Sequence, residues 1–228
     1  MNQNYSTVAQ RSSSAIATNK VLRSTYMLLS LTLLFSCLTA ALSMFMNMPP
    51  MTYMISVIGG MVIAMFVLPR FANSTAGIGI VFLITGMLGF GLGPILSMYA
   101  SLPNGGNIIT LSLGGTGAIF MGLSAYALAT RKDFSFLGGF LMVGFLLVLL
   151  AALANIFLQI PAMSLMISAV VIMIMSGFIL YDTSRIIHGG ETNYVLATIG
   201  LYMTIFNIFI SLLQLLRIIR NDDSFSTI

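Results

Sequence analysis

Seven apolar stretches follow one another along this chain, and each is long enough to cross a lipid bilayer. A transmembrane helix needs about 20 apolar residues, and lipid offers the backbone no hydrogen bonds, so spanning segments are helices or closed barrels. The alternating ten-residue strands of a barrel are not seen in the sequence. We therefore predict an all-α membrane protein, a seven-transmembrane helix bundle, with spans at residues 26–46, 51–68, 76–100, 108–129, 135–158, 162–181 and 195–216.

Composition divides the chain into three parts. Hydrophobic residues make up 58% of the chain and charged residues only 6%, which leaves no room for a water-soluble domain. Residues 1–25 are polar and serine-rich, so we expect a disordered N-terminal tail. Residues 26–216 are expected to form a single membrane domain, followed by a short polar C-terminal tail at 217–228. The first apolar run is too long for a signal peptide, which predicts an uncleaved first helix.

The distribution of positive charge predicts the orientation, because Lys and Arg concentrate in cytoplasmic loops. Two positive side chains, Arg217 and Arg220, follow the last helix, which either spans despite them or re-enters the cytoplasmic side. The N-terminal segment and the second, fourth and sixth connections carry all the others, and the first, third and fifth connections carry none. We therefore expect a cytoplasmic N-terminus. The seven positive residues on that side are Arg11, Lys20, Arg23, Arg70, Arg131, Lys132 and Arg185.

The stretch YDTSRIIHGGETNY (181–194) gathers three formal charges and the only histidine of the chain between the last two helices. Asp182 is either a helix-end aspartate paired with Arg185 at i,i+3 or an intramembrane acid that senses protons or binds a cation. His188 is either an exposed turn residue or a pH sensor, since an unperturbed histidine titrates at about pH 6.5. Glu191 fits a solvated turn near a helix N-terminus, where its charge is favourable.

The last helix carries a polar face, because its small and polar residues recur every three or four positions. Each unsatisfied polar group facing lipid costs several kcal/mol. We therefore predict that this face turns inward and that the last helix is central, enclosed by the other six. The face either packs against neighbouring helices or lines a hydrated path. Its members are Asn193, Gly200, Thr204, Asn207, Ser211 and Gln214.

Glycines and capping residues predict local details. Gly189 and Gly190 are expected to make the turn before the last helix, which Thr192 or Asn193 would cap. Other glycines predict close helix contacts of the small-residue kind. These are Gly86, Gly89, Gly93, Gly115 and Gly122.

The reactive residues argue against an enzyme. One histidine and one cysteine, Cys37 inside the first helix, offer neither a nucleophile–base pair nor a metal site. We expect no metal and no cofactor. The net charge of +4 reflects membrane orientation and predicts no nucleic-acid partner, so the lipid bilayer is the partner that the composition itself indicates.

The sequence also resembles the Bax inhibitor family of membrane proteins, from about residue 20 to residue 214. Within that family it is most similar to bacterial inner-membrane proteins that modulate the ATP-dependent membrane protease FtsH. The resemblance implies a seven-helix fold with an enclosed last helix, an inner-membrane location and an FtsH-type protease as partner. The matching stretches are KVLRSTYMLLSLTLLFS (20–36), TGMLGFGLGPILSMY (85–99), SAYALATRKDFSFLGG (124–139), ANIFLQIPA (154–162), IIHGGETNY (186–194) and NIFISLL (207–213).

The resemblance implies two functions. The first is modulation of the protease, for which a physical mechanism of substrate-like inhibition can be proposed: the N-terminal tail gives the enzyme a grip, and the packed helices resist extraction. The alternative is a pH-sensitive calcium or cation leak, which in some relatives depends on two aspartates. One stands where Asp182 does, and alignment through Asn-x-Phe places the other at Thr204. This chain therefore lacks the second acid, and a single carboxylate with Arg185 one turn away is expected to stay ionised.

Overall fold

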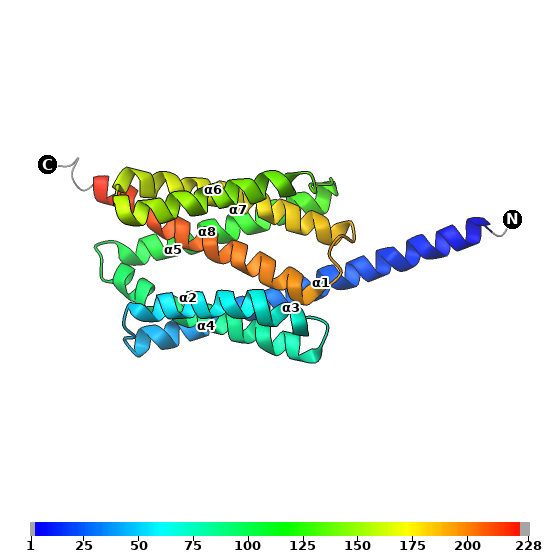
Figure 1. The fold of residues 1–228 in the computed structure, drawn as a ribbon, viewed down its shortest axis with the longest axis horizontal. Helices are drawn as coiled ribbons and strands as arrows, with labels where there is room; N and C mark the ends of the chain where they lie inside the picture. Colours follow the sequence, from blue (N-terminus) through cyan, green and yellow to red (C-terminus); the bar gives the residue numbers. More distant parts are fainter. Residues whose placement is uncertain (1–2, 224–228) are drawn as a thin grey trace. The chain divides into compact units, whose positions relative to one another are not determined.

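The computed structural model describes the backbone of residues 3–223 and the side chains of residues 18–219. Within this range, seven helical segments are long and apolar enough to cross a membrane, with α2, η1 and α3 together forming the second (Figure 1). This confirms the predicted all-α seven-span fold. The elements are α1 (Gln3–Phe45), α2 (Met51–Val62), η1 (Ile63–Val67), α3 (Leu68–Phe71), α4 (Thr75–Ala100), α5 (Gly105–Thr130), α6 (Leu137–Leu158), α7 (Pro161–Ile187) and α8 (Tyr194–Asp223).

Helix α1 begins much earlier than the sequence predicts. It starts at Gln3, whereas the polar composition of residues 1–25 predicts a disordered tail (Figure 1). A helix that is already nucleated extends at little cost. The alanine, glutamine, lysine and arginine residues of this segment are also good helix formers. The apolar span itself begins at Thr18, and the disorder expected of the N-terminal tail stays a prediction.

The second span also runs past its predicted end at Leu68. After α2 the chain passes into the π-helical turn η1, in which the amide of Leu68 donates to the carbonyl oxygen of Ile63, and it continues through α3 to Phe71. Pro69 lacks an amide hydrogen, and its ring crowds the carbonyl four residues earlier. A wider turn just before the proline accommodates both effects. Pro69 therefore changes the type of helix and does not end the span.

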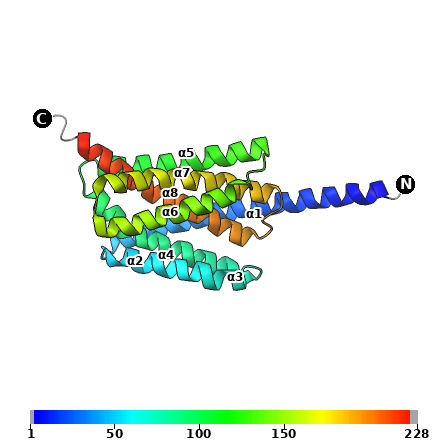
Figure 2. The same ribbon diagram turned by 45° about the horizontal axis from the view of Figure 1, so that its top comes forward.

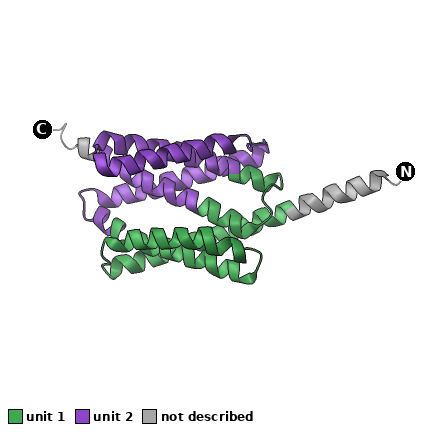
Figure 3. Ribbon diagram, in the orientation of Figure 1, with its two compact units in different colours: residues 1–95, 182–202 green, residues 96–181, 203–228 purple. Residues whose placement is uncertain are grey.

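The chain divides into two compact units, comprising residues 1–95 with 182–202 and residues 96–181 with 203–228 (Figure 3). In the first unit, α2 lies beside α4, as two views show (Figures 1 and 2). Glycines permit this contact: a Cβ atom on Gly60 of α2 would lie only 3.2 Å from the Leu88 side chain of α4. The first unit thus has closely packed helix pairs.

The second unit is organised around a hydrophobic cluster on α7 and α8. Its fully buried members are Met175, Ile179 and Ile208. Phe145 of α6 and Phe178 of α7 meet edge to face, with ring centroids 6.5 Å apart. Partly buried apolar side chains complete the cluster, namely Ile119, Phe120, Leu123, Phe145, Val171, Phe178 and Leu212.

The predicted glycine contacts are observed at some positions and not at others. A Cβ on Gly86 would lie 2.6 Å from Cε1 of Phe35, and one on Gly115 would lie 3.2 Å from Cδ1 of Leu212. A Cβ on Gly122 would meet no described atom within 4 Å. The prediction of a close helix contact is therefore wrong for Gly122.

The last span is the most buried of the seven found in the described residues. In its most apolar stretch 67% of the residues are buried, against 6% for the span of α6. This agrees with an inward position for α8, and its enclosure by all six other spans stays a prediction. Thr204 and Ser211 of the polar face are buried, and Gly200 and Asn207 are half-buried. Gln214 is exposed, so the inward part of the face ends before it.

Two methionines of α7 provide a matched test of this core. Met175 is 5% exposed, whereas Met173, two residues earlier, is 67% exposed. We expect Met175→Ala to lower the free energy of unfolding in detergent micelles by about 2–5 kcal/mol, because truncation leaves a cavity. Met173→Ala should change it by well under about 1 kcal/mol. Equal losses in the two variants would contradict the assignment of this cluster as the core.

Candidate functional site

The turn between α7 and α8 is built around Gly189. Its φ of 75° lies in the left-handed region that glycine adopts without strain. The amides of the turn then reach back to the last carbonyls of α7, with Gly189 N donating to Ile186 O at 3.3 Å and Gly190 N donating to Arg185 O at 2.8 Å. This confirms the prediction that Gly189 and Gly190 make the turn.

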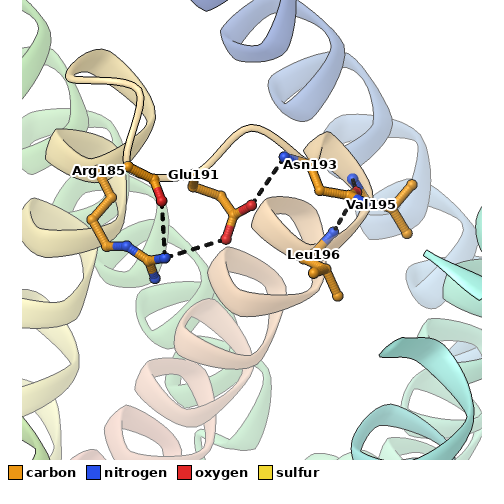
Figure 4. Close-up of polar contacts among 6 residues, drawn as sticks. Arg185, Glu191, Asn193, Val195 and Leu196 are labelled. Atoms are coloured by element: carbon orange, nitrogen blue, oxygen red, sulfur yellow. Dashed lines mark hydrogen bonds and ion pairs between the residues drawn. The ribbon is translucent and has the colours of Figure 1, made fainter. Parts of the chain in front are cut away.

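A chain of polar contacts runs through this turn into α8 (Figure 4). The Nη2 atom of Arg185 donates to the carbonyl oxygen of Gly190 at 3.2 Å and lies 3.4 Å from Oε2 of Glu191. The other carboxylate oxygen of Glu191 accepts a hydrogen bond from the amide of Asn193 at 2.9 Å. Glu191 therefore links the end of α7 to the start of α8. Because both charged side chains are partly exposed, this ion pair contributes about 0–1 kcal/mol.

Asn193 connects this turn to a second one. Its Oδ1 atom caps α8 by accepting hydrogen bonds from the amides of Val195, at 2.9 Å, and Leu196, at 3.3 Å. Its Nδ2 atom donates to the carbonyl oxygen of Ala72 at 3.0 Å and to Oδ1 of Asn73 at 2.8 Å. The predicted capping residue is thus confirmed. The contact to the α3–α4 connection was not predicted, since no local pattern relates residues so distant in sequence.

A pocket of about 380 Å³ lies where these two connections meet. Its walls come from the α3–α4 connection, the first turns of α4 and the start of α8. Amide and hydroxyl side chains dominate the lining, and it includes no charged residue. The pocket is lined by Ala72, Asn73, Ser74, Thr75, Ile78, Thr192, Asn193 and Tyr194.

Asp182 and His188 occupy different environments. Asp182 is half-buried, and a Cβ atom on Gly200 would lie 3.6 Å from its Oδ2 atom, so its carboxylate faces the polar face of α8. His188 follows the end of α7 and is exposed, and its Nδ1 atom donates to the carbonyl oxygen of Ser184 in the last turns of α7 at 2.9 Å. Arg185, the partner of Asp182 in one of the two interpretations of that residue, forms an ion pair with Glu191. A proton- or cation-sensing role for these residues stays a prediction.

The C-terminal part of the polar face of α8 makes contacts of the packing kind. The Nδ2 atom of Asn207 donates to the carbonyl oxygen of Met203 at 2.8 Å, within α8 itself. Ser168 of α7 donates from its hydroxyl to Oε1 of Gln214 at 3.1 Å. Such contacts satisfy polar groups within the protein, and they support the interpretation of this face as a packing surface.

Sequence reasoning missed a buried hydroxyl cluster in the first unit. The Tyr202 hydroxyl donates to the carbonyl oxygen of Thr85 at 3.2 Å. Because its single hydrogen is used there, it accepts one from the hydroxyl of Ser36, 2.6 Å away. A signal was available in the sequence, since the polar residues of α1 recur every three or four positions and so share a face. These are Thr32, Ser36, Thr39 and Ser43.

Comparison with known proteins places this arrangement in a family. Residues 18–222 match the family model described as inhibitor of apoptosis-promoting Bax1. The chain belongs to the Bax inhibitor family. It is 51% identical over 209 residues to the modulator of FtsH protease YccA of Escherichia coli K12, a match covering 92% of this chain and 94% of the relative.

Two further relatives match over a similar length. An uncharacterized membrane protein of Vibrio cholerae is 46% identical over 208 residues, 91% of this chain and 93% of the relative. An uncharacterized protein of Pseudomonas aeruginosa is 49% identical over 203 residues, 89% of this chain and 91% of the relative. The resemblance seen in the sequence is therefore confirmed as Bax inhibitor family membership over nearly the whole chain.

Two stretches that carry the Bax inhibitor resemblance are turns held by asparagine side chains. IIHGGETNY contains the turn described above, with Asn193 at its end. In ANIFLQIPA, Oδ1 of Asn155 accepts from the amide of Ile160 at 3.1 Å, and its Nδ2 atom donates to the Ser164 hydroxyl at 2.7 Å. Gln159 ends α6 in the left-handed region, with a φ of 51°. These motifs therefore have structural roles at helix ends.

The double role of Asn193 predicts a graded loss of stability. We expect Asn193→Ala to lower the free energy of unfolding by about 2–3 kcal/mol, because it removes both a helix cap and the bonds to the neighbouring connection. Asn73→Ala removes one of those bonds and should cost about 1 kcal/mol. The exposed Asn107→Ala, on α5, serves as the control. Thermal unfolding in detergent measures all three, and equal midpoints for Asn193→Ala and Asn107→Ala would contradict the assignment.

Proposed function

We propose that this protein modulates an FtsH-type membrane protease and that it does so as a slowly degraded substrate. The observation that carries the proposal is the 51% identity, over 94% of its length, to an E. coli protein named as a modulator of that protease. The E. coli relative also appears under the name inner membrane protein in a second strain. We therefore also propose an inner-membrane location.

The contacts of the first unit support a cytoplasmic N-terminus. The bonds from Asn193 to Ala72 and Asn73 bring the second and sixth connections together at one end of the unit. The hydroxyls of Tyr26 and Thr183 lie 3.3 Å apart, so the start of the first span lies near the same end. The N-terminal segment carries positive side chains, and so do the last turns of the helices that lead into the two connections, with Arg70 in α3 and Arg185 in α7. This favours the cytoplasmic side for all three.

A slowly degraded substrate has a terminal segment that the enzyme can grip and a membrane domain that the enzyme extracts slowly. The residues ahead of Thr18 are mainly polar, small or amide side chains and lie outside the apolar span, and terminal segments of this kind are where proteolysis starts. The body consists of seven spans, and some of their polar groups bond to a neighbouring helix, as Ser36 does to Tyr202 and Ser168 does to Gln214. While the protease is occupied with this chain, it does not degrade its other membrane substrates, and their half-lives increase.

Pulse-chase measurements test the proposal in cells with active and inactivated protease. We expect the intact chain to be degraded only when the protease is active, and its overproduction to lengthen the half-life of a second membrane substrate. Deleting residues 2–17 should slow degradation of the chain itself, because the grip is lost. Replacing these residues by a shuffled segment of equal composition should restore degradation.

Two results would contradict the proposal. One is an unchanged half-life of the second substrate at any level of this chain. The other is degradation of the deletion variant as fast as that of the intact chain.

A further inference from the structure

Helix α1 contacts the rest of the first unit through one face, and these contacts begin at the N-terminal end of its span. The Tyr26 hydroxyl lies 3.3 Å from Oγ1 of Thr183 on α7. The Thr198 hydroxyl on α8, which donates to Tyr194 O of its own helix at 2.7 Å, also lies 3.3 Å from the carbonyl oxygen of Thr25, and both threonines are fully buried. The first level of contact therefore joins α1 to the two last helices.

The second level lies near the middle of the span. Ser36 donates to the Tyr202 hydroxyl of α8 at 2.6 Å, and Tyr202 donates in turn to the backbone of α4 at Thr85. Beside this pair, α4 approaches α1 so closely that only glycine fits at position 89. A Cβ atom there would overlap the Ser36 carbonyl oxygen and the Thr39 hydroxyl. Three helices thus meet at one level, with both polar contacts and backbone proximity.

The third level lies near the end of α1. A Cβ atom on Gly93 of α4 would overlap the side chain of Ser43 and would lie 2.9 Å from the amide nitrogen of Met44. Ser43 is fully buried. Thr25 and Ser43 are 18 residues apart, which at 1.5 Å per residue is about 27 Å along the helix axis. The three levels therefore extend over nearly the full hydrocarbon thickness of a bilayer, about 30 Å.

The opposite face of α1 has no comparable attachment within the described residues. Leu31, Leu34, Leu38 and Leu42 are each about half or more exposed, with values of 49%, 65%, 69% and 54%. Apolar side chains of this kind are in contact with lipid tails, which resist displacement little because one apolar environment replaces another. The polar and glycine-lined face is therefore the main attachment of the first span.

We propose that this face, formed by Thr25, Tyr26, Ser36, Thr39 and Ser43 and here named the α1 clamp, sets the rate at which a protease extracts the first span. The inference rests on the proposed function, and it assigns the slow step to particular contacts. A pull on the N-terminal segment acts along the axis of α1. The force therefore acts on the contacts of all three levels at the same time. When α1 slides along its axis, these contacts break together instead of one after another.

Extraction also separates the hydroxyls that meet between helices, Ser36 from Tyr202 and Tyr26 from Thr183, and a polar group left unpaired in an apolar environment is costly. When the enzyme cleaves faster than the helix can return, degradation follows the rate of opening. The clamp therefore determines how long the protease stays occupied, and with it the delay imposed on other substrates.

Matched glycine substitutions on α4 test the clamp. Gly89→Ala places a methyl group against Ser36 and Thr39, whereas Gly79→Ala makes the same change where no described atom lies within 4 Å. We expect the half-life of the Gly89→Ala chain in cells with active protease to fall by about threefold or more, the effect of losing one interhelical contact in a membrane. Gly79→Ala should match the unsubstituted chain. Protection of a second membrane substrate should fall in the same order.

A second pair of variants changes a hydroxyl and leaves the packing intact. Tyr202→Phe removes the oxygen that bonds to Ser36, and Tyr126→Phe makes the same change at a side chain that is 46% exposed on α5. We expect Tyr202→Phe to have a shorter half-life than the unsubstituted chain, and Tyr126→Phe to have the same half-life as that chain. Each variant should elute as one species in detergent and persist in cells with inactivated protease, which separates faster extraction from failure to fold. If Gly89→Ala fails this criterion, the tyrosine pair decides the outcome.

The outcomes distinguish the clamp from the function on which it rests. If the unsubstituted chain is neither degraded by the protease nor protective, the proposed function is wrong. If it is degraded and protective, but Tyr202→Phe decays at the rate of Tyr126→Phe, the clamp is overturned and the proposed function stands.

Discussion

A polar group inside an apolar span has to find its partner within the protein, because lipid offers none. Some hydroxyls of this chain bond to carbonyl oxygens of their own helix, as Thr85 does to Val81 and Ser112 to Ile108, both at or below 2.9 Å. Tyr202 instead bonds to two other helices, to Ser36 of α1 and to the backbone of α4 at Thr85. Bonds of this second kind join one span to another. The polar residues of this protein therefore determine which helices are joined and at which positions.

The same constraint connects the architecture to the proposed modulation of a protease. Contacts that satisfy buried hydroxyls also hold α1, the span nearest to the segment that an ATP-driven enzyme would grip. The turn around Gly189 also joins helices, but through contacts outside the apolar spans. There Asn193 joins α8 to the α3–α4 connection. In the proposed mode of action, contacts that delay extraction of the first helix determine how long the protease stays occupied.

Periodic and local features were predictable from the sequence. Apolar length gave the seven spans, and the Gly189 turn and the Asn193 cap follow from the backbone preferences of glycine and asparagine. Contacts between distant segments were not predictable, since nothing near Asn193 indicates Asn73 and nothing near Ser36 indicates Tyr202. The local rule that proline ends a helix also failed at Pro69, where a π-helical turn accommodates the proline within the span.

The pairing of Ser36 with Tyr202 provides the most direct test that polar groups of the spans satisfy one another. The measurement is a double-mutant cycle on the free energy of unfolding in detergent micelles, with Ser36→Ala, Tyr202→Phe and the double variant. The account predicts a favourable coupling energy of about 0.6–1.7 kcal/mol, as for other hydrogen bonds between transmembrane helices. Additive losses, with a coupling energy below about 0.3 kcal/mol, would contradict it.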